Sequence, residues 1–504
     1  MPQPHPKFER PSDPLAAQNQ FRQQTYAAQS WPSFAVAKAQ LPQPVLPEHE
    51  SWVKLYWRAW EIAWQNLRQP QPASDLVANF LDAATDDCLF MWDSAFMSQF
   101  GLYGRRAFNF MGNLDNLYAK QHDDGFICRQ IDLASGEDLF YPFDPNGTGP
   151  NILAWVEWRS YRFTGDDDRL AKVFPPLVAY HRWCRANRTW PNGLYWATGH
   201  SSGLSNQPRV PDSSYHHRHW SWVDASMQAS LNSLILAQMA ATLKEEALAT
   251  ELEAEHARLV ELINKHFWNE ATQFYQDVNA DGRFSPVKSI AAYWGLLDPG
   301  LISEKRLEPF VQALRENWAF KLPHRVPSQS ADSEGYNFET GRYWRGGVWP
   351  SSNFMVLRGL RQVGQHGLAH EIGVNHLLNV TKVYERTGSL WENYAPETAA
   401  PGAPAAENPV GMAGLSPIAI LLEDVIGIAV DWPQRRVFWD RRLVCERPYG
   451  VENYPLGPDG KLSMVADAHK LVLTTDLPFT LTLRDAAQSI QTAVPSGTTE
   501  IDLE

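Results

Sequence analysis

The spacing of apolar residues predicts helices through most of the chain between residues 50 and 428. In the first of these helices, Trp52, Tyr56, Trp60 and Ala63 recur every three or four residues, the stripe of an amphipathic helix. We expect Pro70 to end it, because proline interrupts the hydrogen bonding of an α-helix. Three pairs of similar segments follow, at 151–163 with 167–188, 224–242 with 245–267, and 353–361 with 368–386.

The turn inside the first pair carries signals that end one helix and begin the next. Gly165 is expected as a C-cap and Asp166 as an N-cap, which predicts a helical hairpin. Long loops rich in Trp, Gly, Asp and Tyr join the pairs, whereas a simple bundle needs only short connections. The pattern therefore predicts a mainly α fold, in which inner and outer helices close a toroid with a funnel at one end.

The two ends of the chain differ from this helical region of 46–428. Residues 1–45 are rich in Pro and Gln and lack sustained periodicity, so we interpret them as an extension that wraps the body or stays mobile. After Trp432, short runs rich in β-branched and aromatic residues alternate with Pro, Gly and Asp turns. Residues 429–504 are therefore predicted as a small antiparallel β-domain.

The composition is that of a globular protein, and its charge disfavours some classes of binding partner. A net charge of −13, spread along the 504 residues, disfavours nucleic acid and anionic membranes. The chain shows no signal-peptide pattern, and its four cysteines form no C-x-x-C pair, so we expect a cytoplasmic protein. Its 21 Trp residues exceed what a core alone requires, and some of these rings suit stacking against sugars. A small carbohydrate is the expected partner, and a homo-oligomer is compatible with the sequence.

Five separated motifs combine aromatic, charged, amide and small residues. They are WDSAF at 92–96, GLYW with SGLSNQPR at 193–209, WVDASMQ at 222–228, YWRGGVWP at 343–350, and WENYAPET at 391–398. Their order and spacing resemble the motif set of glycoside hydrolase family 63, most closely its bacterial mannosylglycerate and glucosylglycerate hydrolase-like branch. The resemblance covers residues 50–428 and implies an (α/α)6 barrel and an inverting, exo-acting α-glycosidase of small α-glucosides or α-mannosides, with glycerate-type aglycones among the candidates.

An inverting glycosidase needs one carboxylic acid and one carboxylate on opposite faces of the sugar. By the resemblance, Glu392 occupies the position of the general base. Its neighbours Trp391 and Tyr394 would limit its solvation and leave a water held on one side.

The general-acid position departs from the family pattern. Where the family has Asp in S-G-x-D-N-x-P-R, this chain has Ser205, and a serine hydroxyl does not deliver a proton as a carboxylic acid does. Three explanations remain open: another carboxylate, with Asp212 and Asp224 nearest in sequence, supplies the proton; the protein binds sugars or slowly cleaves those with good leaving groups; or the chain is an engineered, inactive form. A carbohydrate-binding pseudoenzyme is therefore the alternative to an enzyme.

The remaining motif residues receive supporting roles. The resemblance implies that Trp92 and Asp93 hold hydroxyls of the non-reducing sugar, and Arg209 and Arg345 either bind an anionic aglycone or pair with pocket carboxylates. Trp344 and Trp349 are the expected stacking platforms, and Gly346 and Gly347 between them would let the backbone approach a ring. Further expected pocket residues are Gln121, Asn206, Trp222, Asp224 and Tyr343.

No cofactor or metal is predicted. The segment DVNADG at 277–282 begins like a calcium loop, but Lys288 stands at its twelfth position, so we interpret it as a hydrated turn. The histidines of HHRH at 216–219 lack zincin spacing and are expected at the surface or the pocket rim. An epimerase or a polysaccharide lyase on the same barrel is disfavoured, because the histidines gather in loops and the net charge is acidic.

Overall fold

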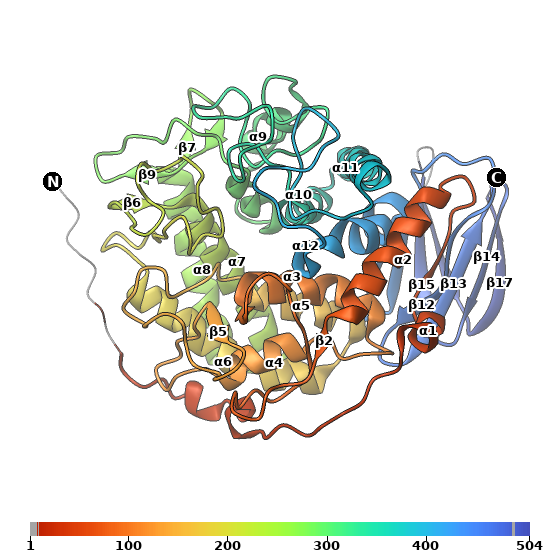
Figure 1. Ribbon diagram of the computed structural model, residues 1–504, viewed down its shortest axis with the longest axis horizontal. Coiled ribbons are helices and arrows are strands. Elements are labelled where there is room, and N and C mark those ends of the chain that lie inside the picture. Colours follow the sequence, from red (N-terminus) through yellow and green to blue (C-terminus); the bar gives the residue numbers. More distant parts are fainter. Residues whose placement is uncertain (1–7, 9, 486–488, 504) are drawn as a thin grey trace.

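A ring of helices with β-sheets at one side forms the body of the protein (Figure 1). The computed structural model describes residue 8 and the ranges 10–485 and 489–503. Six helical segments contact one another in a cycle, each packing against the next and the last against the first. In chain order they are α3 (Met91–Gly101), α5 (Leu153–Thr164), α7 (Val223–Thr242), the 3₁₀ helix η5 (Ile290–Leu297), α10 (Pro350–Gln362) and the π-helix η7 (Leu415–Ile426).

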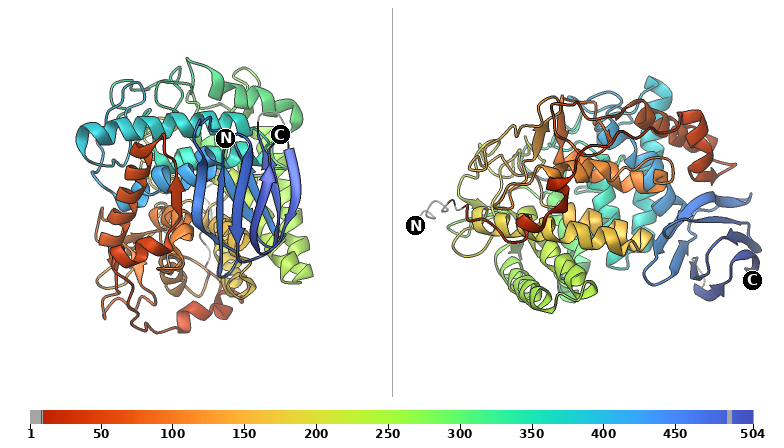
Figure 2. Two further views of the ribbon diagram at one scale, coloured as in Figure 1. Left: turned by 90° about the vertical axis from the view of Figure 1, so that its right-hand side faces the viewer. Right: turned by 90° about the horizontal axis from the view of Figure 1, so that it is seen from below.

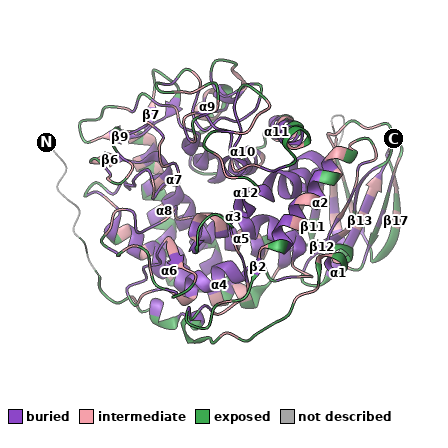
Figure 3. Ribbon diagram, viewed as in Figure 1, coloured by how far each residue is buried: buried purple, intermediate pink, exposed green. Residues whose placement is uncertain are grey.

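The helices outside this cycle pack against it with one face. They are α2 (Glu50–Gln65), α4 (Gly112–Ala119), α6 (Asp167–Asn187), α8 (Glu246–His266), α9 (Glu304–Gln312) and α11 (His366–Thr387). In α8 the buried positions include Leu252, Leu259 and Ile263, spaced as one stripe of a helix. By contrast, all 12 residues of η7 are buried, as expected for a helix surrounded by others. Figure 3 shows the same contrast between buried inner and partly exposed outer segments.

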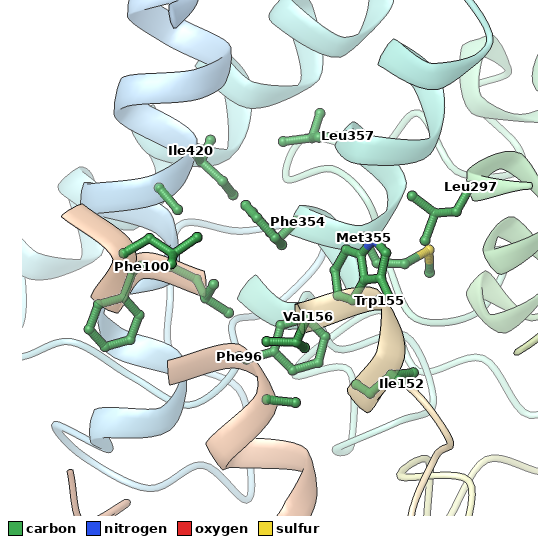
Figure 4. Close-up of a cluster of buried hydrophobic side chains, with 14 of the residues drawn as sticks. Phe96, Phe100, Ile152, Trp155, Val156, Leu297, Phe354, Met355, Leu357 and Ile420 are labelled. Atoms are coloured by element: carbon green, nitrogen blue, oxygen red, sulfur yellow. The ribbon is translucent and has the colours of Figure 1, made fainter. Parts of the chain in front are cut away.

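The inner helices meet in an apolar cluster (Figure 4). Phe96 and Phe100 come from α3, Trp155 and Val156 from α5, and Phe354 from α10. The ring of Trp155 lies edge-on to Trp294 of η5, with centroids 5.5 Å apart. Because these side chains come from segments far apart in sequence, their burial fixes the inner helices relative to one another.

The helices predicted from apolar spacing are present. The first hairpin is α5 and α6, with Gly165 in the left-handed region at φ 70° and the Asp166 side chain accepting a hydrogen bond from Arg169 N–H. The pairs α7–α8 and α10–α11 lie where the other two pairs were expected. The end of the first helix was predicted wrongly: α2 stops at Gln65, and Leu67–Arg68 already forms strand β2, so the chain leaves the helix before Pro70.

The C-terminal region is a pair of packed sheets, and the prediction of purely antiparallel pairing was wrong. One sheet has the order β10-β11-β15-β16 and the other β1-β12-β13-β14-β17. Strand β11 pairs with β15 in parallel. The three strands that lie between them in sequence, β12, β13 and β14, pair antiparallel with one another in the other sheet. The strands are β10 (Ile428–Asp431), β11 (Arg436–Asp440), β12 (Tyr449–Leu456), β13 (Gly460–Ala466), β14 (Lys470–Thr475), β15 (Phe479–Arg484), β16 (Ser489–Val494) and β17 (Gly497–Asp502).

The N-terminal extension runs along the helical body to the β-sheets (Figures 1 and 2). Phe21 is fully buried, and the Arg10 guanidinium pairs with the Asp124 carboxylate at 2.6 Å. The extension contains η1 (Ala16–Gln18), η2 (Gln20–Gln23), α1 (Phe34–Ala37) and η3 (Lys38–Gln40), and it ends in β1 (Gln43–Val45). Because β1 pairs with β12, residues 43–45 belong to the C-terminal sheet rather than to a separate segment.

Short two-stranded sheets hold the loops between the helices. They pair β2 with β3 (Phe80–Leu81), β4 (Cys88–Phe90) with β5 (Gln130–Asp132), β6 (Trp220–Ser221) with β9 (Val278–Asn279), and β7 (Trp268–Asn269) with β8 (Phe274–Tyr275). Two short helical segments, η4 (Leu102–Gly104) and η6 (Ala313–Arg315), extend α3 and α9, and α12 (Val410–Ala413) precedes η7. Within the described ranges, no helix is long and apolar enough to cross a membrane.

Candidate active site

The motif residues gather around the N-terminal ends of inner helices. Trp92 and Asp93 lie in the first turn of α3, Asp224 lies in the first turn of α7, and Trp349 is the N-cap residue of α10. Glu392 follows α11 in the loop that leads to α12. Several helix N-termini, with their free N–H groups and positive dipole ends, thus belong to the same side of the ring as the candidate carboxylates.

Two hydrogen bonds hold the Glu392 carboxylate in place. Its Oε1 accepts from the Tyr343 hydroxyl at 3.2 Å, and its Oε2 accepts from the Ala406 N–H at 3.2 Å. Burial raises the pKa of Glu392 above its ordinary value, while these two bonds favour the ionised form. A half-buried carboxylate with a raised pKa and a fixed direction has the properties that a general base requires.

The segment 343–345 connects Glu392 to the loop that carries Ser205. Tyr343 donates to Glu392, the next residue Trp344 donates its N–H to Asn206 Oδ1 at 3.0 Å, and Arg345 Nε donates to the Asn206 carbonyl at 3.4 Å. Asn206 Nδ2 also donates to the Arg342 carbonyl at 2.9 Å. Three consecutive residues therefore link the candidate base to the neighbour of Ser205.

Close backbone packing shapes this segment. Gly346 has φ 126°, and a Cβ there would lie 2.6 Å from the Tyr336 ring. At Gly347 a Cβ would lie 2.2 Å from the Tyr343 carbonyl oxygen. A side chain at 347 would displace Tyr343, which meets Glu392, and a side chain at 346 would displace Tyr336.

Asp93 lies against the backbone of α12 and shares an electrostatic environment with Glu392. A Cβ at Gly411 would be 2.1 Å from Asp93 Oδ1, so only glycine leaves room for this carboxyl group. Burial, and then the charge of Glu392, raise the pKa of Asp93 to about 7. The neighbouring Trp92 ring faces the Ser205 loop, because it lies 3.5 Å from the place of a Cβ on Gly203.

We predict that Asp93 makes the stability of the fold fall as pH rises from 5 to 7.5. Its pKa is about 7 in the folded protein and near 3.8 when unfolded, so in this range the folded state binds the extra proton and loses it as pH rises. Relative to Asp93→Asn, the wild-type free energy of unfolding should fall by roughly 2–3 kcal/mol over that range. Urea unfolding of both proteins at several pH values measures the difference, and parallel pH curves would contradict the shifted pKa.

Ser205 lies in a loop whose backbone is closely packed. Its carbonyl accepts from the Ser214 hydroxyl at 3.3 Å, and a Cβ on Gly199 would lie 2.4 Å from the same oxygen. Gln207 is buried and donates to the Ser328 carbonyl at 2.7 Å. The Ser205 side chain itself is half-buried, so the loop presents it from a rigid backbone.

Arg209 and Asp224 form a buried ionic cluster beneath this loop. The guanidinium is 0% exposed, bonds Asp224 Oδ2 at 2.7 Å and lies 3.7 Å from Asp277 Oδ2. It also lies over the Trp222 ring, 4.3 Å from the centroid. Burial raises the pKa of Asp277 to about 6 against the opposing effect of Arg209. Arg209 thus takes the structural pairing that was one of its two expected roles, with Asp224 as its partner.

Breaking this cluster should strongly destabilise the fold. Asp224→Asn leaves the buried Arg209 with only the more distant Asp277 as a partner, and we expect a loss of about 3 kcal/mol in the free energy of unfolding. A matched control is Glu270→Gln, because that side chain is 74% exposed and 3.6 Å from Arg306. The control should cost far less in urea unfolding, because an exposed ion pair contributes little to stability. Equal costs for both variants would contradict a structural role for the cluster.

Other expected pocket residues are placed differently from the prediction. Trp344 and Trp349 are each 2% exposed and stack on one another with centroids 3.9 Å apart, and Trp349 also packs edge-on against Tyr343, so neither ring presents a free face. Gln121 is buried, and its amide donates to the Gly125 and Pro176 carbonyls and accepts from Asn19. It therefore braces the N-terminal extension, and none of these three bonds reaches the residues around Glu392.

The two segments discounted as metal sites form ordinary packing. Asp277, expected in a hydrated turn, is 1% exposed because it faces Arg209, whereas Asp281 and Gly282 form the exposed turn itself. His217 of the 216–219 segment is 4% exposed and packs edge-on against Trp190. Among the described residues, no group of three or more His, Cys, Asp or Glu side chains is arranged to hold a metal ion.

Three contributions to the site were not foreseen from the sequence. The Ala406 N–H fixes Glu392, Gly411 leaves room for Asp93, and Asp86 raises the pKa of both Glu392 and Asp93 through its charge. Asp86 is exposed in the loop before β4. The first two are backbone effects that carry no side-chain signal, and Asp86 lies six residues before the nearest motif.

The helical ring and the paired motif loops are those of a glycoside hydrolase. The chain belongs to the family described as the mannosylglycerate hydrolase MGH1-like glycoside hydrolase domain, whose model matches residues 88–408. The family resemblance carried by the five motifs is thereby confirmed, and the chain is a glycosidase by family.

Relatives and a solved structure agree with this assignment. An uncharacterised protein of Borreliella burgdorferi is 26% identical over 69% of this chain and 73% of its own length. Mannosylglycerate hydrolase MGH1 of Selaginella moellendorffii is 25% identical over 61% of this chain and 75% of its own. The crystal structure of the family 63 mannosylglycerate hydrolase from Thermus thermophilus with glucose has a TM-score of 0.57 at 23% identity, covering 73% of this chain and 98% of that one, and shows likeness of fold.

Proposed function

We propose that the protein is an inverting, exo-acting glycosidase of small α-glucosides or α-mannosides, with Glu392 as the general base. The single observation that carries the proposal is the continuous set of contacts from Glu392 through Tyr343 and Trp344 to Asn206, next to Ser205. These contacts support a general base at one end of the segment 343–345 and a leaving-group position at the other. An inverting pair requires such an arrangement, with about 6.5–9.5 Å between the two groups so that sugar and water fit between them.

The proposed site lies at one end of an (α/α)6 ring. The cycle of contacts among α3, α5, α7, η5, α10 and η7 supports a closed inner ring, with outer helices packed around it. Because the motif residues belong to the N-terminal ends of inner helices, the loops at that end would form the funnel that admits one sugar. A site closed on the side of Asp93 and α12 would take the non-reducing end, which is the exo mode.

Different residues of this chain would bind the sugar, activate the water and receive the leaving group. Asp93 and Trp92 hold the non-reducing sugar, with the Asp93 carboxyl group bonding its hydroxyls. Glu392, directed by Tyr343 and Ala406, takes a proton from a water that attacks the anomeric carbon. The leaving group departs toward Ser205. Position 205 is where the resemblance puts the general acid, so leaving groups that need protonation should depart slowly from this chain.

The surroundings of Asp212 and Asp224 do not favour either as the proton donor. Asp224 is 1% exposed and its carboxylate is bonded to the Arg209 guanidinium, which favours the ionised form over a proton donor. Asp212 lies in an exposed turn at φ 50°, where nothing buries its carboxyl group. These surroundings favour slow or selective cleavage of sugars with good leaving groups over a proton supplied by Asp212 or Asp224.

The experiment is proton NMR of 4-nitrophenyl α-mannoside and α-glucoside hydrolysis by the purified chain. We expect hydrolysis of at least one of them, with the β-anomer of the free sugar as the first product. First formation of the α-anomer would contradict inversion. Binding of sugar without any turnover would instead favour the carbohydrate-binding alternative.

A further inference from the structure

A guanidinium without an acidic partner lies beside the serine that replaces the expected acid. Arg345 Nε donates to the Asn206 carbonyl at 3.4 Å, and Asn206 directly follows Ser205. Within the described part of the chain, no carboxylate lies within 4.0 Å of the Arg345 guanidinium. Arg209, by comparison, is 0% exposed and bonded to Asp224, so its charge is neutralised.

A second arginine stands on the same rim. Arg342 is exposed, and its backbone carbonyl is held by Asn206 Nδ2 at 2.9 Å. The two acidic side chains of the site have different neighbours: Glu392 contacts Tyr343, and Asp93 lies against Gly411. Two arginines therefore adjoin the residue that follows Ser205, and neither of the two carboxylates of the site has a recorded contact with them.

We propose that the substrate carries an anionic phosphate leaving group: the protein hydrolyses α-glycosyl phosphodiesters, with Arg345 binding the phosphate beside Ser205. This inference rests on the proposed function, because it places the leaving group at position 205. Guanidinium groups bind phosphate oxygens through charge-assisted, bidentate hydrogen bonds. A serine at position 205 adds a neutral hydroxyl donor, whereas an aspartate there would repel the phosphate and pair with Arg345.

The reaction balances without a general acid. Glu392 takes one proton from water, the water oxygen forms a bond to the anomeric carbon, and the bond from that carbon to the bridging oxygen breaks with its electron pair left on the phosphate. The products are the inverted sugar and a phosphomonoester dianion, and the proton on Glu392 passes to solvent. The dianion is the conjugate base of an acid with a pKa of about 6, so it leaves without protonation at neutral pH. No bond to phosphorus is broken.

This assignment explains why the base and its supports coexist with a missing acid. An ordinary sugar alkoxide is a far stronger base than a phosphate dianion and needs a proton to leave. Losing the carboxyl group at 205 would disable cleavage of ordinary glycosides, yet it would free Arg345 for an anion. One substitution therefore changes both the proton donor and the charge of the leaving-group side.

The test compares two substrates that need no acid. Methyl phosphodiesters of α-mannose and α-glucose 1-phosphate carry the proposed anion, whereas α-mannosyl and α-glucosyl fluoride report on the base and the sugar pocket alone. We expect Arg345→Gln to lower kcat/KM for the phosphodiester by roughly 100-fold and for the fluoride by a smaller factor. Arg283→Gln, an exposed arginine in the 279–283 turn, is the matched control and should change neither. Inorganic phosphate should inhibit fluoride hydrolysis competitively in the wild type and weakly in Arg345→Gln.

The outcomes separate this inference from the proposed function. Suppose that fluoride hydrolysis depends on Glu392. The phosphate assignment would then be overturned if the phosphodiester is not hydrolysed, or if Arg345→Gln affects both substrates equally, and the proposed glycosidase function would still stand. Failure to hydrolyse either substrate would overturn both. A Ser205→Asp protein should lose at least about 10-fold on the phosphodiester, because it introduces a like charge beside the anion. An unchanged rate in that protein would also contradict the assignment.

Discussion

Ser205→Asp is expected to raise the hydrolysis of unactivated α-glycosides by roughly 10²- to 10⁴-fold, the range that general acid catalysis contributes. The backbone of the loop is already fixed by Ser214, Gly199 and the Asn206 contacts, so the new carboxyl group would stand where a glycosidic oxygen needs its proton. Initial rates on an α-linked disaccharide or a glycerate-type glycoside, before and after the substitution, give the measurement. Hydrolysis of the corresponding glycosyl fluoride should change far less.

A matched control separates the effect of the position from the effect of an added charge. Ser303→Asp adds the same charge at the exposed N-cap of α9, away from the site, and should leave all rates unchanged. If the unaltered chain already cleaves disaccharides well, another carboxyl group supplies the proton. Asp93 would then be the first to test, because its pKa of about 7 lets it carry a proton at neutral pH.

Glu392→Gln is expected to lower hydrolysis of every substrate by roughly 10³-fold or more, glycosyl fluorides included. The amide keeps the size of the side chain and its contact to the Tyr343 hydroxyl, yet it does not accept a proton from water. The effect should appear in kcat with little change in KM, because the base acts on water and not on sugar binding. This behaviour distinguishes it from substitutions at Arg345, which depend on the leaving group.

The neighbouring Glu397 supplies the matched control. It lies in the same 391–398 motif, is exposed, and accepts a hydrogen bond from the Tyr336 hydroxyl at 3.0 Å. Glu397→Gln should alter rates by no more than a few-fold. Comparable losses in both variants would mean that the loop, rather than the Glu392 carboxylate, is required for activity.

The fold was predictable where a local signal existed. The caps at Gly165 and Asp166 and the stripes of the paired helices act within a few residues, so the sequence alone located these hairpins. The parallel pairing of β11 with β15 was not predictable, because it depends on three intervening strands that pack in another sheet. Strand β1 likewise pairs with β12, which lies far away along the chain, and no local pattern signals that contact.

The candidate site divides in a similar way. Motif order located Glu392, Ser205 and Asp93, but the roles of Arg209 and Trp344 were assigned from residue type alone. In the structure, Arg209 is neutralised by Asp224, and Trp344 is covered by Trp349, two partners that also belong to the motifs. A motif therefore identified residues near the site without separating those that face a ligand from those that hold the loops.

The most direct measurement is a crystal structure of the Glu392→Gln protein with an α-mannoside or α-glucoside bound. We predict that the non-reducing sugar lies between residues 392 and 205. A water should lie between the anomeric carbon and the amide introduced at position 392, and the glycosidic oxygen should be directed toward the Ser205 hydroxyl. A sugar bound elsewhere, or residues 392 and 205 on the same face of the anomeric carbon, would contradict it.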